Sequence, residues 1–213
     1  MLELYDYELS GNCYKIRLML SFLNLNYTSK KVEFYPSKEH KSESFLELNP
    51  LGQLPVISDR SVVLRDAQAI LVYLAAKYDK SKNWYPIDDT DKLGFISQWL
   101  AFGDSITGSS SAARLHDTLF YGDFDIVKCR EMAHSQFRIL DEHLFFQEEL
   151  GNKWICNGSH ASIADIACFP YVALSEEGGI SRMSYPAIRR WMDRFKRIEG
   201  FVVMPGVFPA GPL

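Results

Sequence analysis

Ser10 and Cys13 stand where their side chains can do chemistry, at the expected junction of a strand and a helix. Residues 2–7 alternate apolar and polar side chains, which predicts a short strand, and apolar residues over 16–23 recur with mainly helical spacing. A helix that begins near Ser10 leaves free backbone N–H groups and a positive dipole end, which together stabilise an anion. The alternative is an ordinary helix N-cap, and the two interpretations are compatible.

Cys13 follows Ser10 in the sequence Ser10-Gly11-Asn12-Cys13, which has the spacing of a Cys-x-x-Cys redox loop. Serine holds the first, exposed position of that loop, so disulfide exchange through the usual first cysteine is not available. We therefore expect a buried, inert thiol at Cys13, and a redox role for this thiol is the alternative.

A second feature that could bind a ligand is the Leu54-Pro55 bond, which follows the turn Asn49-Pro50. Proline donates no ladder hydrogen bond, so Pro55 must open a strand or lie on a sheet edge. A cis bond would turn the backbone N–H and C=O of Leu54 outward, where they can pair with an extended peptide. The more common alternative is a trans bond.

The surrounding pattern predicts strands at 2–7, 27–34, 56–58 and 61–64. It predicts a helix that begins near Ser10 and contains the apolar residues of 16–23, and further helices at 44–48 and 66–78. The first strand-helix-strand unit implies a parallel pair with a right-handed crossover. The last two strands, joined by Asp59-Arg60, form a hairpin. The predicted fold is an α/β thioredoxin-like N-terminal domain (βαβ-αββα) followed by an all-α C-terminal helical domain.

The second part of the chain is predicted to be helical throughout. We expect an N-terminal domain over 1–79, a polar linker over 80–89 and a helical domain over 90–213. Core packing explains an apolar stripe made of Phe95, Trp99, Phe102 and Ile106. Further helices are expected over 126–144 and 188–197, and one that Ser162 opens in a capping box with Asp165. A solvated surface is preferred for Arg114 and His116, and the alternative is that they face a polar substrate from a bend in the helix.

Composition excludes several function classes. The formal net charge of −4 and the pI of about 5.7 argue against a nucleic-acid partner. Four scattered cysteines with no ligand spacing indicate no metal site and a reduced, cytoplasmic setting. The N-terminus has no signal-peptide pattern, and no apolar run is long enough for a membrane span.

Taken together, these motifs resemble the glutathione transferases, and the opening resembles the theta class without a gap. The resemblance covers nearly the whole chain. Its segments are Leu2-Glu3-Leu4-Tyr5, Ser10, Cys13, Glu39-His40-Lys41-Ser42, Asn49-Pro50-Leu51-Gly52, Leu54-Pro55, Ala69-Ile70 and Ser162-Ile-Ala-Asp165. The closing segments that begin at Tyr185 and Gly200 are similar to many bacterial members.

The resemblance implies that glutathione is a co-substrate and that the Ser10 hydroxyl donates a hydrogen bond to its sulfur. Such a donor favours the thiolate and lowers the thiol pKa. The residues implied to surround glutathione are His40, Lys41, Gln53, Leu54, Pro55, Asp66 and Ala67. The Leu54-Pro55 bond would be cis, and the Leu54 backbone would pair with the cysteinyl part. His40 and Lys41 would meet the glycyl carboxylate, with a solvated charged loop as their alternative, and Asp66 and Ala67 would lie at the γ-glutamyl end.

Ala67 departs from the family pattern, which has serine there. A lost hydrogen bond to a charged group costs about 1.5–3 kcal/mol, so glutathione binding is expected to be weaker. Some classes use a tyrosine near the end of the first strand, which makes Tyr7 the rival of Ser10. Without gaps, however, that tyrosine falls on Asp6, so Ser10 is preferred.

The resemblance further implies a homodimer and a hydrophobic electrophile bound beside Phe102, Asp104 and Ile106, with Asp104 reaching the glutathione amine across the dimer. The expected function is a detoxifying glutathione transferase. Four alternatives stay open: a non-catalytic protein-binding module, a zeta-like isomerase, a disulfide reductase and a peroxidase.

Overall fold

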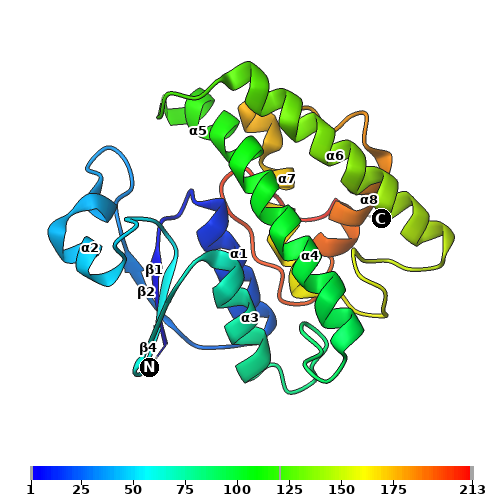
Figure 1. Cartoon of the computed structure of the whole chain (residues 1–213), viewed down its shortest axis with the longest axis horizontal. Coiled ribbons are helices and arrows are strands. Elements are labelled where there is room, and N and C mark those ends of the chain that lie inside the picture. Colours follow the sequence, from blue (N-terminus) through cyan, green and yellow to red (C-terminus); the bar gives the residue numbers. More distant parts are fainter. Residues whose placement is uncertain (1, 120, 212–213) are drawn as a thin grey trace.

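The computed structural model describes residues 2–119 and 121–211 of the 213-residue chain. Its sheet contains β1 (Leu2–Asp6), β2 (Thr28–Lys31), β3 (Val56–Asp59) and β4 (Val62–Arg65) in the order β2-β1-β3-β4. β1 pairs in parallel with β2 and antiparallel with β3, and the β3–β4 hairpin completes the sheet. These pairings and the helices that follow confirm the predicted fold class (Figure 1).

The helices of the first part are α1 (Gly11–Phe22), a 3₁₀ turn η1 (Glu39–Lys41), α2 (Glu43–Leu48) and α3 (Ala67–Tyr78). α1 and α3 lie between the sheet and the second, helical part of the molecule (Figure 1).

Each strand differs from its predicted range at one end or both, most clearly in β2 and in the β3–β4 turn. β2 ends before residue 34, because the chain leaves the sheet toward Pro36, which cannot continue a ladder. The hairpin turn lies one residue later than expected, with Arg60 at a φ of 59°.

The second part consists of helices and helical turns. They are α4 (Thr90–Ile106), a π-helical turn η2 (Thr107–Ser111), α5 (Ala112–Leu119), α6 (Ile126–Glu149), α7 (Ile163–Ala173), a 3₁₀ turn η3 (Ser175–Gly178) and α8 (Pro186–Lys196). The predicted capping box of Ser162 and Asp165 opens α7. Asp165 also accepts hydrogen bonds from Ile155 N (3.1 Å) and Trp191 Nε1 (2.9 Å), so its role is structural.

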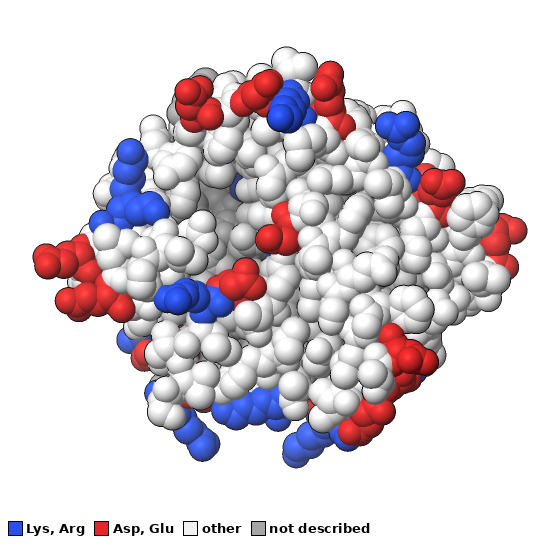
Figure 2. All heavy atoms as spheres, viewed as in Figure 1, with Lys and Arg blue, Asp and Glu red and all other residues white. Residues whose placement is uncertain are grey.

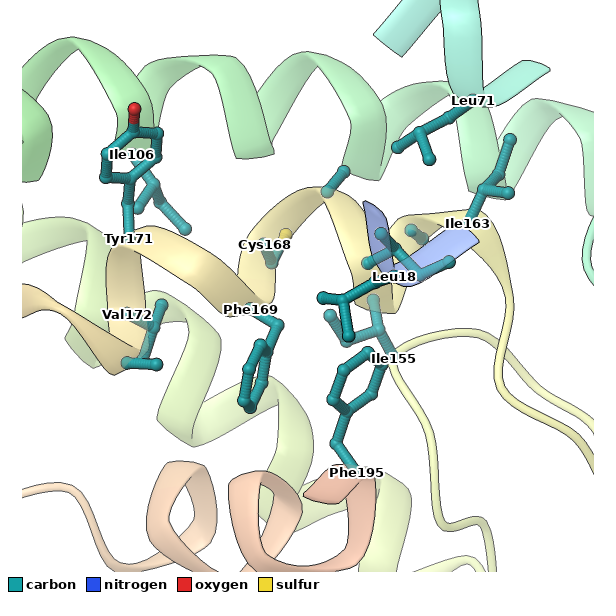
Figure 3. Packing of buried hydrophobic residues seen from close by; sticks show 14 of the residues in the cluster. Leu18, Leu71, Ile106, Ile155, Ile163, Cys168, Phe169, Tyr171, Val172 and Phe195 are labelled. Atoms are coloured by element: carbon teal, nitrogen blue, oxygen red, sulfur yellow. The ribbon is translucent and has the colours of Figure 1, made fainter. Parts of the chain in front are cut away.

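α7 lies at the centre of the hydrophobic core, and all of its residues are buried. Figure 3 shows Cys168 and Phe169 of this helix among side chains from α1, α3, α4 and α8, including Leu18 and Phe195. The core therefore continues from the first part of the chain into the second. Residues 79–89 form no helix or strand, and the domain boundaries stay a prediction.

One expectation about the core is wrong. Phe95 is 57% exposed, whereas Trp99 and Ile106 of the same predicted stripe are buried. The buried face of α4 also contains Ile96 and Leu100, so it is rotated by one residue from the predicted stripe.

Within the described residues, no helix is long and apolar enough to cross a membrane.

Candidate functional site

A cavity of about 700 Å³ lies between the first residues of α1 and α3 and the helical wall formed by η2, α5 and α7. Figure 2 shows a hollow on this face of the molecule, with acidic side chains at its edge and a basic group deep inside it. Six of the residues predicted to bind or activate glutathione line the cavity: Ser10, Gln53, Leu54, Pro55, Asp66 and Ala67. Asp104 lines it as well. Segments that are far apart in the sequence therefore meet here.

Ser10 is the N-cap of α1 and borders the cavity. Its Oγ accepts a hydrogen bond from the Cys13 N–H at 3.2 Å, because the extended backbone of Ser10 directs the side chain over the first helical turn. With its oxygen engaged as an acceptor, the hydroxyl proton is free to be donated. Both interpretations of Ser10, as an N-cap and as a donor to an anion, are therefore sterically compatible.

The Leu54-Pro55 peptide bond is cis, as predicted. Asn49 holds the preceding turn, since its Nδ2 donates to Gln53 O (2.8 Å) and its Oδ1 accepts from Leu51 N (3.1 Å). Among the described residues, neither the N–H nor the C=O of Leu54 has a hydrogen-bond partner. An extended peptide in the cavity finds a donor and an acceptor there.

The start of α3 provides a negatively charged end to the cavity. Asp66 is the N-cap of this helix, with a φ of 78°, and its Oδ1 accepts from Ala69 N at 2.9 Å. Gln68 Nε2 donates to Asp104 Oδ1 at 3.3 Å, which ties α3 to α4. Asp66 and Asp104 both line the cavity, whereas Ala67 adds no side-chain donor.

His40 and Lys41 lie outside the residues that line the cavity. The His40 ring is buried, stacks on Phe34 at 4.2 Å, and has a pKa lowered by burial. Neither ring nitrogen of His40 has a partner in the described part of the chain. Lys41 Nζ donates to Leu51 O at 3.0 Å, so in this structure it braces the turn before Leu54.

The residues that line the expected electrophile side of the cavity differ from those predicted. Phe102 packs on Trp99 with ring centroids 5.0 Å apart, and Ile106 is fully buried, so neither borders the cavity. The helix widens into the π-helical turn after Ile106, and Thr107 and Ser111 line the cavity instead. The wall is consequently more polar than the sequence indicated.

Cys13 is fully buried, and burial raises the pKa of its thiol to about 12. A thiol that is neither accessible nor ionised is a poor nucleophile, which agrees with the expectation of an inert residue. Tyr7 does line the cavity. Burial raises the pKa of its phenol too, so this hydroxyl stays protonated at neutral pH.

Arg114 was interpreted as a surface residue, and this is wrong: it is buried and lines the cavity. Its Nη1 donates to Leu9 O at 2.6 Å, across 105 positions of sequence. Sequence reasoning also missed Tyr171, whose hydroxyl accepts from Asn12 N at 3.3 Å. No local sequence pattern predicts the Arg114–Leu9 or the Tyr171–Asn12 hydrogen bond, because each joins the first part of the chain to the second. His116 is partly exposed and pairs with Asp117.

Lys15 is a buried cation that the sequence did not single out. Its Nζ donates to Thr107 Oγ1 at 3.1 Å and lies 5.5 Å from the centroid of the Tyr171 ring. Burial lowers the pKa of its amine to about 8. The side chain thus links α1 to the π-helical turn beneath the cavity.

No cluster of three or more metal-ligating side chains occurs within 2–119 and 121–211, and the expected absence of a metal stays a prediction.

Comparison with known proteins gives consistent matches. Residues 9–77 match the family profile described as "Glutathione S-transferase, N-terminal domain". Glutathione S-transferase theta-1 of Rattus norvegicus is 28% identical over 206 residues, which cover 95% of this chain and 84% of the relative.

Solved structures agree with these sequence matches. A glutathione S-transferase from Pseudomonas fluorescens superposes with a TM-score of 0.84 at 29% identity, covering 95% of this chain and 98% of the other. A glutathione transferase homolog from Lodderomyces elongisporus, described "with two GSH per subunit", has a TM-score of 0.83 at 23% identity, covering 93% and 94%. At 23% identity, the similarity to the Lodderomyces elongisporus structure supports the fold alone.

Proposed function

Because this chain belongs to the cytosolic glutathione S-transferase superfamily, we propose that it binds glutathione in the cavity at Ser10 and transfers it to an electrophile. In this proposal the Ser10 hydroxyl donates to the glutathione sulfur and favours its thiolate form. The sulfur then attacks an electrophilic carbon, an S–C bond forms, and the leaving group departs with the electron pair of the broken bond.

The observation that carries this proposal is the geometry of Ser10. Its oxygen is fixed by the Cys13 N–H, at the positive end of α1, and its side chain borders a cavity of ligand size. A thiolate is stabilised at that place by both the hydroxyl proton and the helix terminus.

The remaining contacts follow from the peptide nature of glutathione. The backbone of Leu54 pairs with its cysteinyl residue, with Gln53 and Pro55 shaping the turn. In this proposal Asp104 acts on the glutathione of its own chain instead of across the dimer, and it holds the γ-glutamyl ammonium group together with Asp66. The backbone N–H of Ala67 takes the γ-glutamyl carboxylate. His40 and Lys41 stay proposed for the glycyl carboxylate and need a rearrangement of the Lys41–Leu51 contact.

Glutathione binding measured by calorimetry, together with conjugation to 1-chloro-2,4-dinitrobenzene, tests this proposal. We expect saturable binding and turnover above the uncatalysed rate. A protein that binds no glutathione at millimolar concentration contradicts it.

A second candidate is a non-catalytic binding module, which Ala67 favours because the usual hydroxyl donor is missing. Retention on immobilised glutathione with no turnover of any electrophile supports that candidate. The buried thiol of Cys13 disfavours a redox reaction at Cys13 itself, whereas a disulfide reductase or peroxidase that uses the activated glutathione thiol stays an alternative. We further propose that the protein is a cytoplasmic, detoxifying homodimer in which the first domain of one chain packs on the second domain of the other.

A further inference from the structure

The cavity wall formed by the helical part carries several polar side chains, although the hydroxyl proton of Thr107 is already donated to Gly103 O at 3.0 Å. Thr107 and Ser111 reach it from the two ends of the π-helical turn, and Arg114 and Tyr171 reach it from α5 and α7. π-Helical turns are rare and occur often at functional sites. Ser110, between them, is turned inward, where its Oγ donates to Tyr171 O at 2.6 Å. Ser110 therefore has a structural role, whereas the neighbouring Ser111 lines the cavity.

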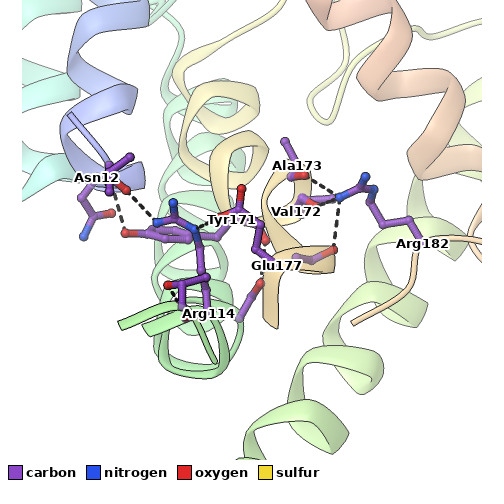
Figure 4. A network of polar contacts seen from close by, with 11 residues as sticks. Asn12, Arg114, Tyr171, Val172, Ala173, Glu177 and Arg182 are labelled. Atoms are coloured by element: carbon purple, nitrogen blue, oxygen red, sulfur yellow. Dashed lines mark hydrogen bonds and ion pairs between the residues drawn. The ribbon is translucent and has the colours of Figure 1, made fainter. Parts of the chain in front are cut away.

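Arg114 is fixed by the protein before any ligand binds (Figure 4). Its Nε donates to Glu177 Oε2 at 2.5 Å and its Nη1 to Leu9 O at 2.6 Å. A guanidinium group has five N–H donors, so these two bonds leave donors unused. No partner of Arg114 Nη2 is found among the residues that the structure describes.

The guanidinium group lies beside the place where the thiol is proposed to react. The carbonyl that it contacts belongs to Leu9, the residue directly before Ser10. Because Ser10 and Arg114 also line the same cavity, one bound ligand can contact both side chains. A buried, preorganised arginine is the side chain best suited to a carboxylate.

We propose that Arg114, with Ser111, binds a carboxylate carried by the electrophile next to the carbon that the thiolate attacks. This rests on the proposed transferase function and replaces a wholly hydrophobic electrophile with an anionic one. For an unsaturated keto acid, the sulfur bonds to the carbon that bears the carboxylate. The C=C electron pair moves to the ketone oxygen, and the resulting enolate takes a proton from water.

A matched pair of electrophiles tests this subsite: 3-benzoylacrylate and its methyl ester, each with glutathione. We expect the acid to have the higher kcat/KM after division by the uncatalysed rates. Arg114→Gln is expected to lower this acid-to-ester ratio by about tenfold or more, as for one lost charge-assisted hydrogen bond. Arg114→Lys is expected to restore part of the ratio, because it returns the charge.

Arg182 supplies the matched control, because backbone carbonyls and a glutamate hold it as they hold Arg114 (Figure 4). Its partners are the carbonyls of Val172 and Ala173 and the carboxylate of Glu176. It does not line the cavity. Arg182→Gln should therefore leave the acid-to-ester ratio unchanged. The double variant Arg114→Gln/Glu177→Gln avoids leaving Glu177 unpaired and serves if the single variant unfolds.

The glutathione adducts of the two probes separate this inference from the transferase proposal. Calorimetry is expected to show tighter binding of the acid adduct and loss of that preference in Arg114→Gln. An equal or reversed preference, in either binding or kcat/KM, overturns the carboxylate subsite. If the acid adduct binds better but the protein turns over neither these probes nor 1-chloro-2,4-dinitrobenzene, the transferase proposal fails while the subsite stands.

Discussion

Replacing Lys15 by methionine is expected to stabilise the protein at neutral pH. Lys15 is fully buried, and burial lowers the pKa of its amine from 10.5 to about 8. Below pH 8 the native state must therefore hold a charge that the interior disfavours. Methionine is unbranched like lysine and carries no charge. Thr107 would lose one donor, but its hydroxyl still donates to Gly103 O at 3.0 Å.

The lowered pKa sets the size and the sign of the effect. It corresponds to about 3 kcal/mol of native-state destabilisation below pH 8, because the unfolded chain binds the proton more tightly. The lost Lys15–Thr107 hydrogen bond offsets about 1 kcal/mol of this, which leaves a net gain of about 2 kcal/mol at pH 7. Between pH 8 and 10.5 only the unfolded chain is protonated. The wild-type penalty therefore fades as pH rises, and about 1 kcal/mol of the gain disappears between pH 7 and 9.

Urea unfolding of both proteins at pH 7, 8 and 9 measures this difference, and Lys128→Met, at an exposed position on α6, gives the baseline for a lost lysine. A Lys15→Met protein less stable than the wild type at pH 7 contradicts the reasoning. So does a stability difference that does not change with pH, because it would mean that Lys15 is not an isolated buried cation.

Three further results are expected. Ala67→Ser should tighten glutathione binding by about 1 kcal/mol in calorimetry; unchanged or weaker affinity would mean that the γ-glutamyl end is held differently. Cys13→Ser should retain conjugation, and wild-type Cys13 should form no adduct with oxidised glutathione in mass spectrometry. At a pKa of about 12 only about one Cys13 thiol in 10⁵ is ionised at pH 7. A glutathione adduct on Cys13 would therefore support the alternative, a redox role for this thiol. Light scattering at micromolar concentration should give twice the 24.4 kDa chain mass, and a monomer would refute the proposed dimer.

The features that sequence predicted well are those determined by neighbouring residues. The Ser162 capping box needs only Asp165 within one helical turn, and the N-cap at Ser10 needs only the start of α1. The cis bond before Pro55 followed from the resemblance, because an isolated sequence favours trans.

The features that sequence missed depend on tertiary packing. The Arg114–Leu9 and Tyr171–Asn12 hydrogen bonds span 105 and 159 positions, and both form only when the helical part packs on α1. Phe95 was misplaced because one residue of rotation decides which side of an apolar stripe faces the core. The cavity wall was therefore the least predictable part of the site.

The pKa of the glutathione thiol bound to this protein tests the central claim, that Ser10 stabilises the thiolate. Ultraviolet absorbance of the thiolate, followed against pH, measures it for the wild type, Ser10→Ala and Ser10→Thr. We expect a bound pKa below that of free glutathione, a rise of about 1–2 pH units in Ser10→Ala, and a smaller change in Ser10→Thr, which keeps the hydroxyl. Turnover at neutral pH should fall by about tenfold or more in Ser10→Ala. A bound thiol whose pKa is the same in the wild type and in Ser10→Ala would contradict the account.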